Sequence, residues 1–263
     1  MISSPTFDQL LAEPHQTPAD WLAAQPHWDS TFGSMAVVLT QPSSTLIVFA
    51  FGLLTIVLGT RLWARSPRVA AARWWGTGLI LWGAGALSAG VSYQALGFCL
   101  RGQGRDFMAL TDGFQIAYLA LSAASIAALG VAVALRSHTG RGQTWLRSAV
   151  ALLLGIYWFV LQSGVTTADR FALSFEAMVL ITTPSFLIYF AVAAVRWRKT
   201  GLAQEARLAW VWVGLGLTFA LYGLAAAFGL GAFLWTYGVW FTENDVLHLA
   251  LAVWMLALYR VVR

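Results

Sequence analysis

Charged residues and cysteine are scarce in this sequence of 263 residues. Only 10% of the residues are charged, whereas soluble domains carry about 25%. Hydrophobic residues reach 59% and the mean hydropathy is +0.70, a combination that excludes an ordinary soluble domain. The single cysteine, Cys99, excludes an intrachain disulfide and a cysteine-built metal site. The composition therefore indicates an integral membrane protein.

Long apolar windows are what the sequence has in abundance. A helix needs about 20 predominantly apolar residues to cross the hydrocarbon core. Seven windows of roughly this length lie at 44–62, 74–98, 114–135, 145–164, 170–195, 208–233 and 243–260. They do not alternate between polar and apolar residues as the strands of a barrel do. We therefore expect an all-α integral membrane bundle of seven transmembrane helices over residues 43–263.

The basic residues indicate the orientation of this bundle. Thirteen of the sixteen follow the first, third, fifth and seventh windows, and only Arg101, Arg105 and Arg170 lie on the other side. Because cytoplasmic loops carry the excess of lysine and arginine, we expect the N-terminus outside and the C-terminus in the cytoplasm. This topology accounts for the net charge of +5, so the expected partner is the lipid bilayer and not nucleic acid. The low lysine and high arginine and alanine content indicate a bacterial cytoplasmic (inner) membrane, whereas the oligomeric state leaves no signature.

The first 42 residues contain no lysine or arginine, so they do not resemble a secretory signal peptide, which begins with a positive region. Ser4 followed by Pro5, and the segment TPAD (Thr17 to Asp20), are typical helix starts. Residues 1–42 are therefore expected to form an external N-terminal segment with short amphipathic helices. We expect this segment to lie either on the membrane surface or over the bundle as a lid.

Small residues recur every three or four positions in two of the windows. The two stripes are Gly83, Ala86 and Gly90, and Gly223, Ala227 and Gly231. Because small residues let the backbones of membrane helices approach closely, both stripes predict close contacts between helices.

Polar side chains gather near the external ends of five windows. The candidates for a pocket are Tyr93, Gln94, Asp112, Gln115, Tyr118, Glu176, Asp245 and His248. If their helix faces converge, they line an outward-facing polar pocket; if the faces diverge, they are ordinary interfacial residues. Glu176 is expected about 9 Å inside a helix that begins near Arg170, because each residue adds about 1.5 Å. At that depth it is either a functional residue or a protonated acid bonded to a neighbouring hydroxyl or carbonyl.

His248 and Asp245 are three residues apart and share one face of the last predicted helix. A carboxylate in this position would orient the imidazole. The segment TEND (Thr242 to Asp245) is also a capping box, which explains Asp245 without a functional role. Capping does not explain His248, which is therefore the better indication of a site.

Lysine and histidine are too few for several cofactors. A retinal protein needs a lysine in its last helix, and the only lysine, Lys199, lies between windows. Haem held by two histidines is excluded because only His248, of four histidines, lies in a window. Zinc sites draw on more histidine or cysteine than this chain holds, so no metal or other cofactor is expected. The alternative is a metal site built from His248, Glu176 and Asp112.

Three segments carry a resemblance to known families. SAGVSYQALGFCLRGQGRDF (Ser88 to Phe107), TDGFQIAYLALS and NDVLH (Asn244 to His248) resemble signature segments of a family of uncharacterised bacterial seven-helix membrane proteins. More distantly, the chain resembles the seven-helix superfamily of alkaline ceramidases and progestin-type receptors. That superfamily implies a zinc site of three histidines, an aspartate and a serine. Only His248 matches it, because Ala252 and Gln94 stand where histidines are expected, so the zinc site is not carried over.

The sequence thus predicts a polar pocket that binds a small or lipid-derived ligand. One alternative is a membrane-embedded hydrolase of a lipid amide or ester, with His248 as base and Glu176 or Asp112 as its partner. A serine nucleophile would be Ser92 or Ser163, although no GxSxG motif supports either. A second alternative is a structural or assembly subunit whose polar groups serve caps and helix contacts. Whether the chain is an enzyme stays open.

Overall fold

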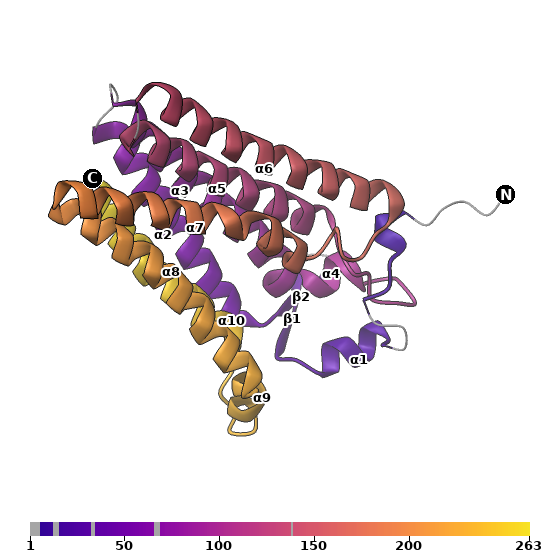
Figure 1. Ribbon diagram of the computed structural model, residues 1–263. Helices are drawn as coiled ribbons and strands as arrows, with labels where there is room; N and C mark the ends of the chain where they lie inside the picture. Colours follow the sequence, from indigo (N-terminus) through magenta and orange to yellow (C-terminus); the bar gives the residue numbers. More distant parts are fainter. Residues whose placement is uncertain (1–5, 13–15, 33–34, 66–68, 138) are drawn as a thin grey trace.

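The protein folds as a helical bundle in a computed structural model that describes residues 6–12, 16–32, 35–65, 69–137 and 139–263 (Figure 1). The long helices are α2 (Pro42–Arg65), α3 (Ala70–Ala89), α5 (Gly113–Ser137), α6 (Gly140–Thr167), α7 (Phe175–Thr200), α8 (Ala203–Ala227) and α10 (Glu243–Val262). The short elements are η1 (Phe7–Gln9), α1 (Pro18–Ala23), the π-helix η2 (Gly90–Ala95), α4 (Gly97–Arg101), α9 (Leu230–Trp235) and the strands β1 (His27–Phe32) and β2 (Met35–Thr40). The all-α class is therefore confirmed for the body of the protein.

Each predicted window overlaps one long helix, although the boundaries differ. Within the described residues, six of these helices are long and apolar enough to cross a membrane: α2, α5, α6, α7, α8 and α10. This indicates a multi-pass membrane protein. α3 does not belong to the six, and it continues directly into η2. The window 208–233 is divided by Gly229, whose φ of 60° ends α8 and separates it from α9.

The N-terminal segment is only partly helical. Thr17 and Asp20 form the predicted capping box at the start of α1, whereas Ser4 and Pro5 lie outside the described residues. The antiparallel hairpin of β1 and β2, with His27 opposite Thr40, was not predicted. We call the end of the bundle that carries this hairpin, α4 and α9 the hairpin end.

The N-terminal segment covers part of the hairpin end. The backbone N–H of Ala12 donates to the Met108 carbonyl at 2.7 Å. The hydroxyl of Thr40 donates to the Gln94 carbonyl, so β2 is tied to η2. Arg170 donates to the carbonyls of Leu11 and Ala12 at 2.8 and 2.7 Å. The segment is therefore hydrogen-bonded to three separate parts of the bundle end.

α3 packs closely between α2 and α5. A Cβ atom on Gly83 would lie 2.5 Å from the Gly52 carbonyl oxygen, and one on Gly76 would lie 2.7 Å from that of Gly59. A Cβ on Gly90 would lie 2.6 Å from Val48 and Phe49 side chains. The close contacts predicted for the stripe through Gly83 and Gly90 are therefore confirmed.

α7 and α8 are arranged differently. The chain between them is only two residues long, and Figure 1 shows the two helices meeting near the C-terminus and diverging toward α9. A Cβ atom on Gly216 or Gly223 would meet nothing within 4 Å. The close packing predicted for the stripe through Gly223 is therefore wrong, because α8 faces open space there and Gly231 belongs to α9.

A buried ion cluster holds α5, α7 and α8 together at the end opposite the hairpin. Glu205 is 2% exposed, and its carboxylate lies 3.4 Å from the Arg136 guanidinium and 3.3 Å from that of Arg196. Arg196 also donates to the Ser137 carbonyl at 2.6 Å. α7 and α8 are thus fastened at this end and free to separate at the other.

Candidate functional site

A cavity of about 1390 Å³ occupies the space that the divergence of α7 and α8 creates. Its wall comes from α3, η2, α5, α7, α8, α9 and α10, with contributions from the N-terminal segment. Ligand pockets for drug-sized molecules measure about 300–1,000 Å³, so this cavity can hold a molecule of lipid size.

Six of the eight pocket candidates line this cavity. They are Tyr93, Gln94, Gln115, Tyr118, Glu176 and His248. Asp112 and Asp245 do not line it, because both carboxylates are buried in hydrogen bonds within the bundle. The helix faces that carry the six therefore converge.

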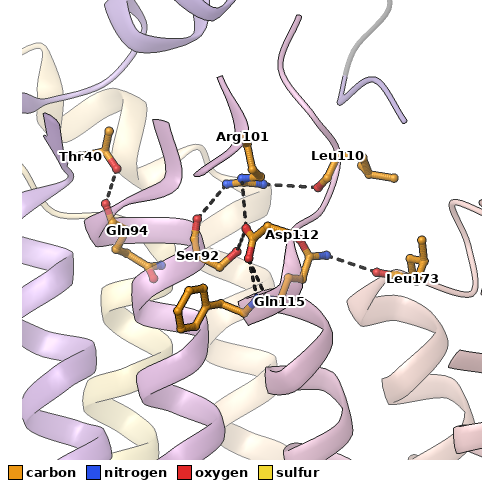
Figure 2. A network of polar contacts seen from close by, with 9 residues as sticks. Thr40, Ser92, Gln94, Arg101, Leu110, Asp112, Gln115 and Leu173 are labelled. Carbon is orange, nitrogen blue, oxygen red and sulfur yellow. Dashed lines mark hydrogen bonds and ion pairs between the residues drawn. The ribbon is translucent and has the colours of Figure 1, made fainter. Parts of the chain in front are cut away.

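Asp112 is the centre of a buried network at the hairpin end (Figure 2). Its Oδ2 accepts from the Ser92 hydroxyl at 2.6 Å and lies 3.8 Å from the Arg101 guanidinium. Its Oδ1 accepts from the backbone N–H groups of Phe114 and Gln115 at 2.7 and 3.1 Å, which caps the start of α5. Asp112 thus serves the fold and is not presented to the cavity.

Arg101 is a residue of this network that the sequence did not single out. It is 7% exposed, and its Nη atoms donate to the carbonyls of Leu110 and Ser92. Its guanidinium carbon lies 5.4 Å from the centre of the Tyr93 ring. Burial lowers the pKa of Arg101, and the Asp112 carboxylate opposes that shift. Its place among only three arginines on the expected external side was the available indication.

Glu176 lies at the mouth of the cavity and not deep in a helix. α7 begins at Phe175, and Ser174 caps it by accepting from the Ala177 N–H at 3.1 Å. The predicted depth of about 9 Å is therefore wrong, because the residues after Arg170 form a turn. The Glu176 side chain is exposed and, among the described residues, makes no hydrogen bond or ion pair.

His248 and Asp245 have separate partners. The Asp245 carboxylate accepts from the Thr242 N–H at 2.7 Å and from the Ser44 hydroxyl at 2.9 Å, so the capping role is confirmed. His248 Nδ1 lies 2.8 Å from the Asn244 carbonyl instead. The prediction that Asp245 orients the imidazole is therefore wrong. Because a carbonyl only accepts, Nδ1 carries the proton in the neutral ring, and Nε2 is left as an acceptor.

Two amide side chains bring buried polar atoms to the cavity wall. Gln94 and Gln115 are 3% and 4% exposed, and the Oε1 atom of each has no hydrogen-bond partner among the described residues. Gln115 Nε2 donates to the Leu173 carbonyl at 3.2 Å, which fixes the orientation of its amide. The oxygen of Gln115 is therefore an unsatisfied acceptor.

Glu243 is a second cavity residue that the sequence did not single out as a candidate. Its Oε1 accepts from the backbone N–H of Gly231 at 2.7 Å, which holds α9 against the start of α10. Its position two residues before Asp245, in the first turn of α10, is that of an acid favoured by the helix dipole. Because the helix dipole already explains an acid at this position, nothing in the sequence indicated that Glu243 lies in the cavity wall.

Apolar side chains form the deeper wall. Trp212 packs against Phe186, Tyr189 and Trp254, with ring centres 5.4 to 6.1 Å apart, and closes the cavity toward the middle of the bundle. Leu187 of α7 and Leu217 of α8 line the cavity and are also 64% and 61% exposed. The cavity wall is therefore open between α7 and α8 on the outer surface of the bundle.

The described residues do not form the metal site or the serine–histidine pair that the sequence offered as alternatives. The described residues contain no group of three or more His, Cys, Asp or Glu side chains that could hold a metal ion. His248 and Glu176 line the cavity, but Asp112 does not, so the proposed metal set is not brought together. Ser92 donates to Asp112, and neither Ser92 nor Ser163 lines the cavity that His248 lines. The predicted serine–histidine pairing is therefore absent from these described residues.

Comparison of the chain with protein-family models, with curated proteins and with solved structures found no match in any of the three.

Proposed function

We propose that this chain is a seven-span protein of a bacterial cytoplasmic membrane that binds a small or lipid-derived amphipathic ligand in an outward-facing pocket. The seventh span would be α3 with η2, since together they extend without interruption from Ala70 to Ala95. The orientation is supported by the ion cluster of Arg136 and Arg196 at the end opposite the hairpin, because cytoplasmic ends carry the excess of arginine.

The observation that carries the proposal is the division of one large cavity into a polar and an apolar part. Glu176, His248 and the two buried glutamines lie toward the hairpin end, whereas Phe186 and Trp212 line the deeper part. Binding sites of this kind combine an apolar wall with a few placed polar groups. A ligand with a polar head and a hydrocarbon chain matches both parts of the wall.

The opening between α7 and α8 supports entry from the bilayer. Exposed apolar side chains such as Leu187 and Leu217 border the cavity at the depth of the helix middles. An amphiphile dissolved in the membrane could therefore pass between the two helices without leaving hydrocarbon. The size of the cavity also favours ligand binding over a role as an assembly subunit, for which caps and helix contacts would suffice.

A substitution that fills the cavity tests this function. Gly216 lines the cavity and has nothing within 4 Å of its Cβ position, so Gly216→Phe places a ring there without displacing the backbone. Gly223→Phe is the matched control, because it lies on the same helix in equally open space but outside the cavity lining. We expect co-purified amphiphile, extracted and quantified by mass spectrometry per mole of protein, to fall at least tenfold in Gly216→Phe only. Equal amounts in all three proteins would overturn the proposal.

A further inference from the structure

The arginines at the cavity are already engaged by the protein. Arg101 lies beside Asp112 and donates to two carbonyls, and Arg170 donates to the carbonyls of Leu11 and Ala12. A phosphate or carboxylate normally binds to arginine donors that are open to it. The cavity therefore offers an anionic head few unoccupied charged donors.

Two of the buried lining groups that have no hydrogen-bond partner among the described residues are amide oxygens. Gln115 Oε1 is buried, lines the cavity and is fixed in position by the hydrogen bond of its own Nε2 to Leu173. Gln94 Oε1 lacks a partner among the described residues as well. A buried acceptor without a hydrogen bond destabilises the protein, so a ligand that donates a hydrogen bond to it is stabilised in the cavity.

The lining carries two arginines, Arg101 and Arg170, and two glutamates, Glu176 and Glu243, while Asp112 lies behind it. Since Asp112 matches Arg101, the carboxylates of Glu176 and Glu243 outnumber Arg170 by one. Glu243 accepts from Gly231, but the Glu176 carboxylate has no hydrogen bond or ion pair among the described residues. A carboxylate that has no partner in the protein can pair with a cationic group of a ligand.

Aromatic rings line the same cavity as Glu176. Tyr93, Tyr118 and Tyr222 are among them, and the rings of Tyr93 and Tyr118 meet edge to face with centres 6.3 Å apart. Ammonium groups bind to such rings through the negative potential of the ring face. Of the lining donors without a hydrogen bond among the described residues, the indole N–H groups of Trp212 and Trp235 carry no charge, and the Arg101 Nε lies 3.8 Å from the Asp112 carboxylate.

We infer that the polar end of the ligand is an ammonium group with N–H donors, joined to a hydrocarbon chain. This inference rests on the proposed function. In the assignment, the ammonium donates to Glu176 and to the oxygens of Gln115 and Gln94, and its chain lies along Phe186 and Phe219. The same head chemistry occurs in a free long-chain amine and in the aminoethyl headgroup of a phospholipid.

Calorimetric titration of the detergent-solubilised protein tests this inference with three probes of one chain length. The probes are octylammonium, octyltrimethylammonium, which has no N–H donor, and octanesulfonate, which is anionic. We expect octylammonium to bind at least tenfold more tightly than either of the others. Glu176→Gln should weaken octylammonium binding at least tenfold and leave octanesulfonate binding unchanged, whereas Asp29→Asn, an exposed acid on β1, should change neither.

Glu243→Gln provides a second variant, because its amide oxygen can still accept from Gly231 and retain the fold. It should weaken octylammonium binding less than Glu176→Gln does.

Binding of octanesulfonate or octyltrimethylammonium as tight as that of octylammonium would overturn the ammonium assignment and leave the amphiphile pocket intact. Absence of saturable binding by every probe, in protein that unfolds at the normal temperature, would overturn both. Competition by dihexanoyl phosphoethanolamine as strong as that by octylammonium would identify the phospholipid headgroup, and weaker competition the free amine; either result supports an ammonium.

Discussion

The bundle has a closed side, formed by α2, α3 and α5, and an open side, formed by α7 and α8. On the closed side, glycines such as Gly83 face a neighbouring backbone at distances that exclude a Cβ atom. On the open side, Gly216 and Gly223 face space. The carboxylates differ in the same way, because both oxygens of Asp112 accept hydrogen bonds whereas Glu176 makes no hydrogen bond among the described residues. The difference separates residues that maintain the fold from residues available to a ligand.

The largest effect is expected from Asp112→Ala on the closed side. The substitution leaves the Arg101 guanidinium buried without its carboxylate and removes the cap of α5. Removing one member of a buried ion pair costs about 3–5 kcal/mol. A thermal unfolding scan in detergent should show a large drop in midpoint, or no folded protein. The exposed Asp29→Ala is the control, and a similar midpoint for both variants would contradict the role given to the network.

Gly83→Phe should cause the second-largest loss of stability. Its ring must displace the Gly52 carbonyl, which lies 2.5 Å from the Cβ position, and overpacking of a tight interior costs about 1–3 kcal/mol or more. The same substitution at Gly223 should leave the unfolding midpoint unchanged or slightly raised, because glycine lowers helix stability. If Gly83→Phe is as stable as Gly223→Phe, α2 and α3 are not closely packed in the membrane.

Gly216→Phe should affect binding and not stability. We expect a loss of at least tenfold in affinity for octylammonium, equivalent to about 1.4 kcal/mol, with an unfolding midpoint within the error of the wild type. Calorimetry and a thermal scan on the same preparation measure both quantities. A fall in stability without a change in affinity would contradict this prediction, because it would show that residue 216 packs against other side chains and does not face a ligand.

Thr242→Ala should give the smallest effect. Its hydroxyl accepts from the Asp245 N–H at 3.3 Å and caps α10, and loss of such a cap costs about 1 kcal/mol. Since Thr242 acts on the helix start, the affinity for octylammonium should change less than threefold. A loss of binding as large as that in Glu176→Gln would show that the capping box also positions the ligand.

The apolar windows were enough to predict the long helices, because the length of an apolar run decides whether a helix can span hydrocarbon. The start of α7 was misplaced because the apolar run continues through the turn before Ser174, and only the cap marks the true beginning. The hairpin was missed because β2 follows from pairing with β1 and contact with η2, which no local pattern records.

The candidate site was predictable in its members and not in its shape. The polar residues were visible because the membrane disfavours them, and six of them do line one cavity. Their division into satisfied and unsatisfied groups depends on partners far away in sequence, as for Asp245 and Ser44, or Gln115 and Leu173. The cavity itself depends on the angle between α7 and α8, which the ion cluster around Glu205 and the short connection determine.

The most direct test is an experimental density map of the protein in lipid nanodiscs. The account predicts elongated density that is not protein inside the cavity, with its polar end near Glu176 and Gln115 and its apolar part beside Phe186. The map should also show α7 and α8 separated toward α9. A map in which α7 and α8 pack together, so that their own side chains fill the space, would contradict the claim that the open side is a binding site.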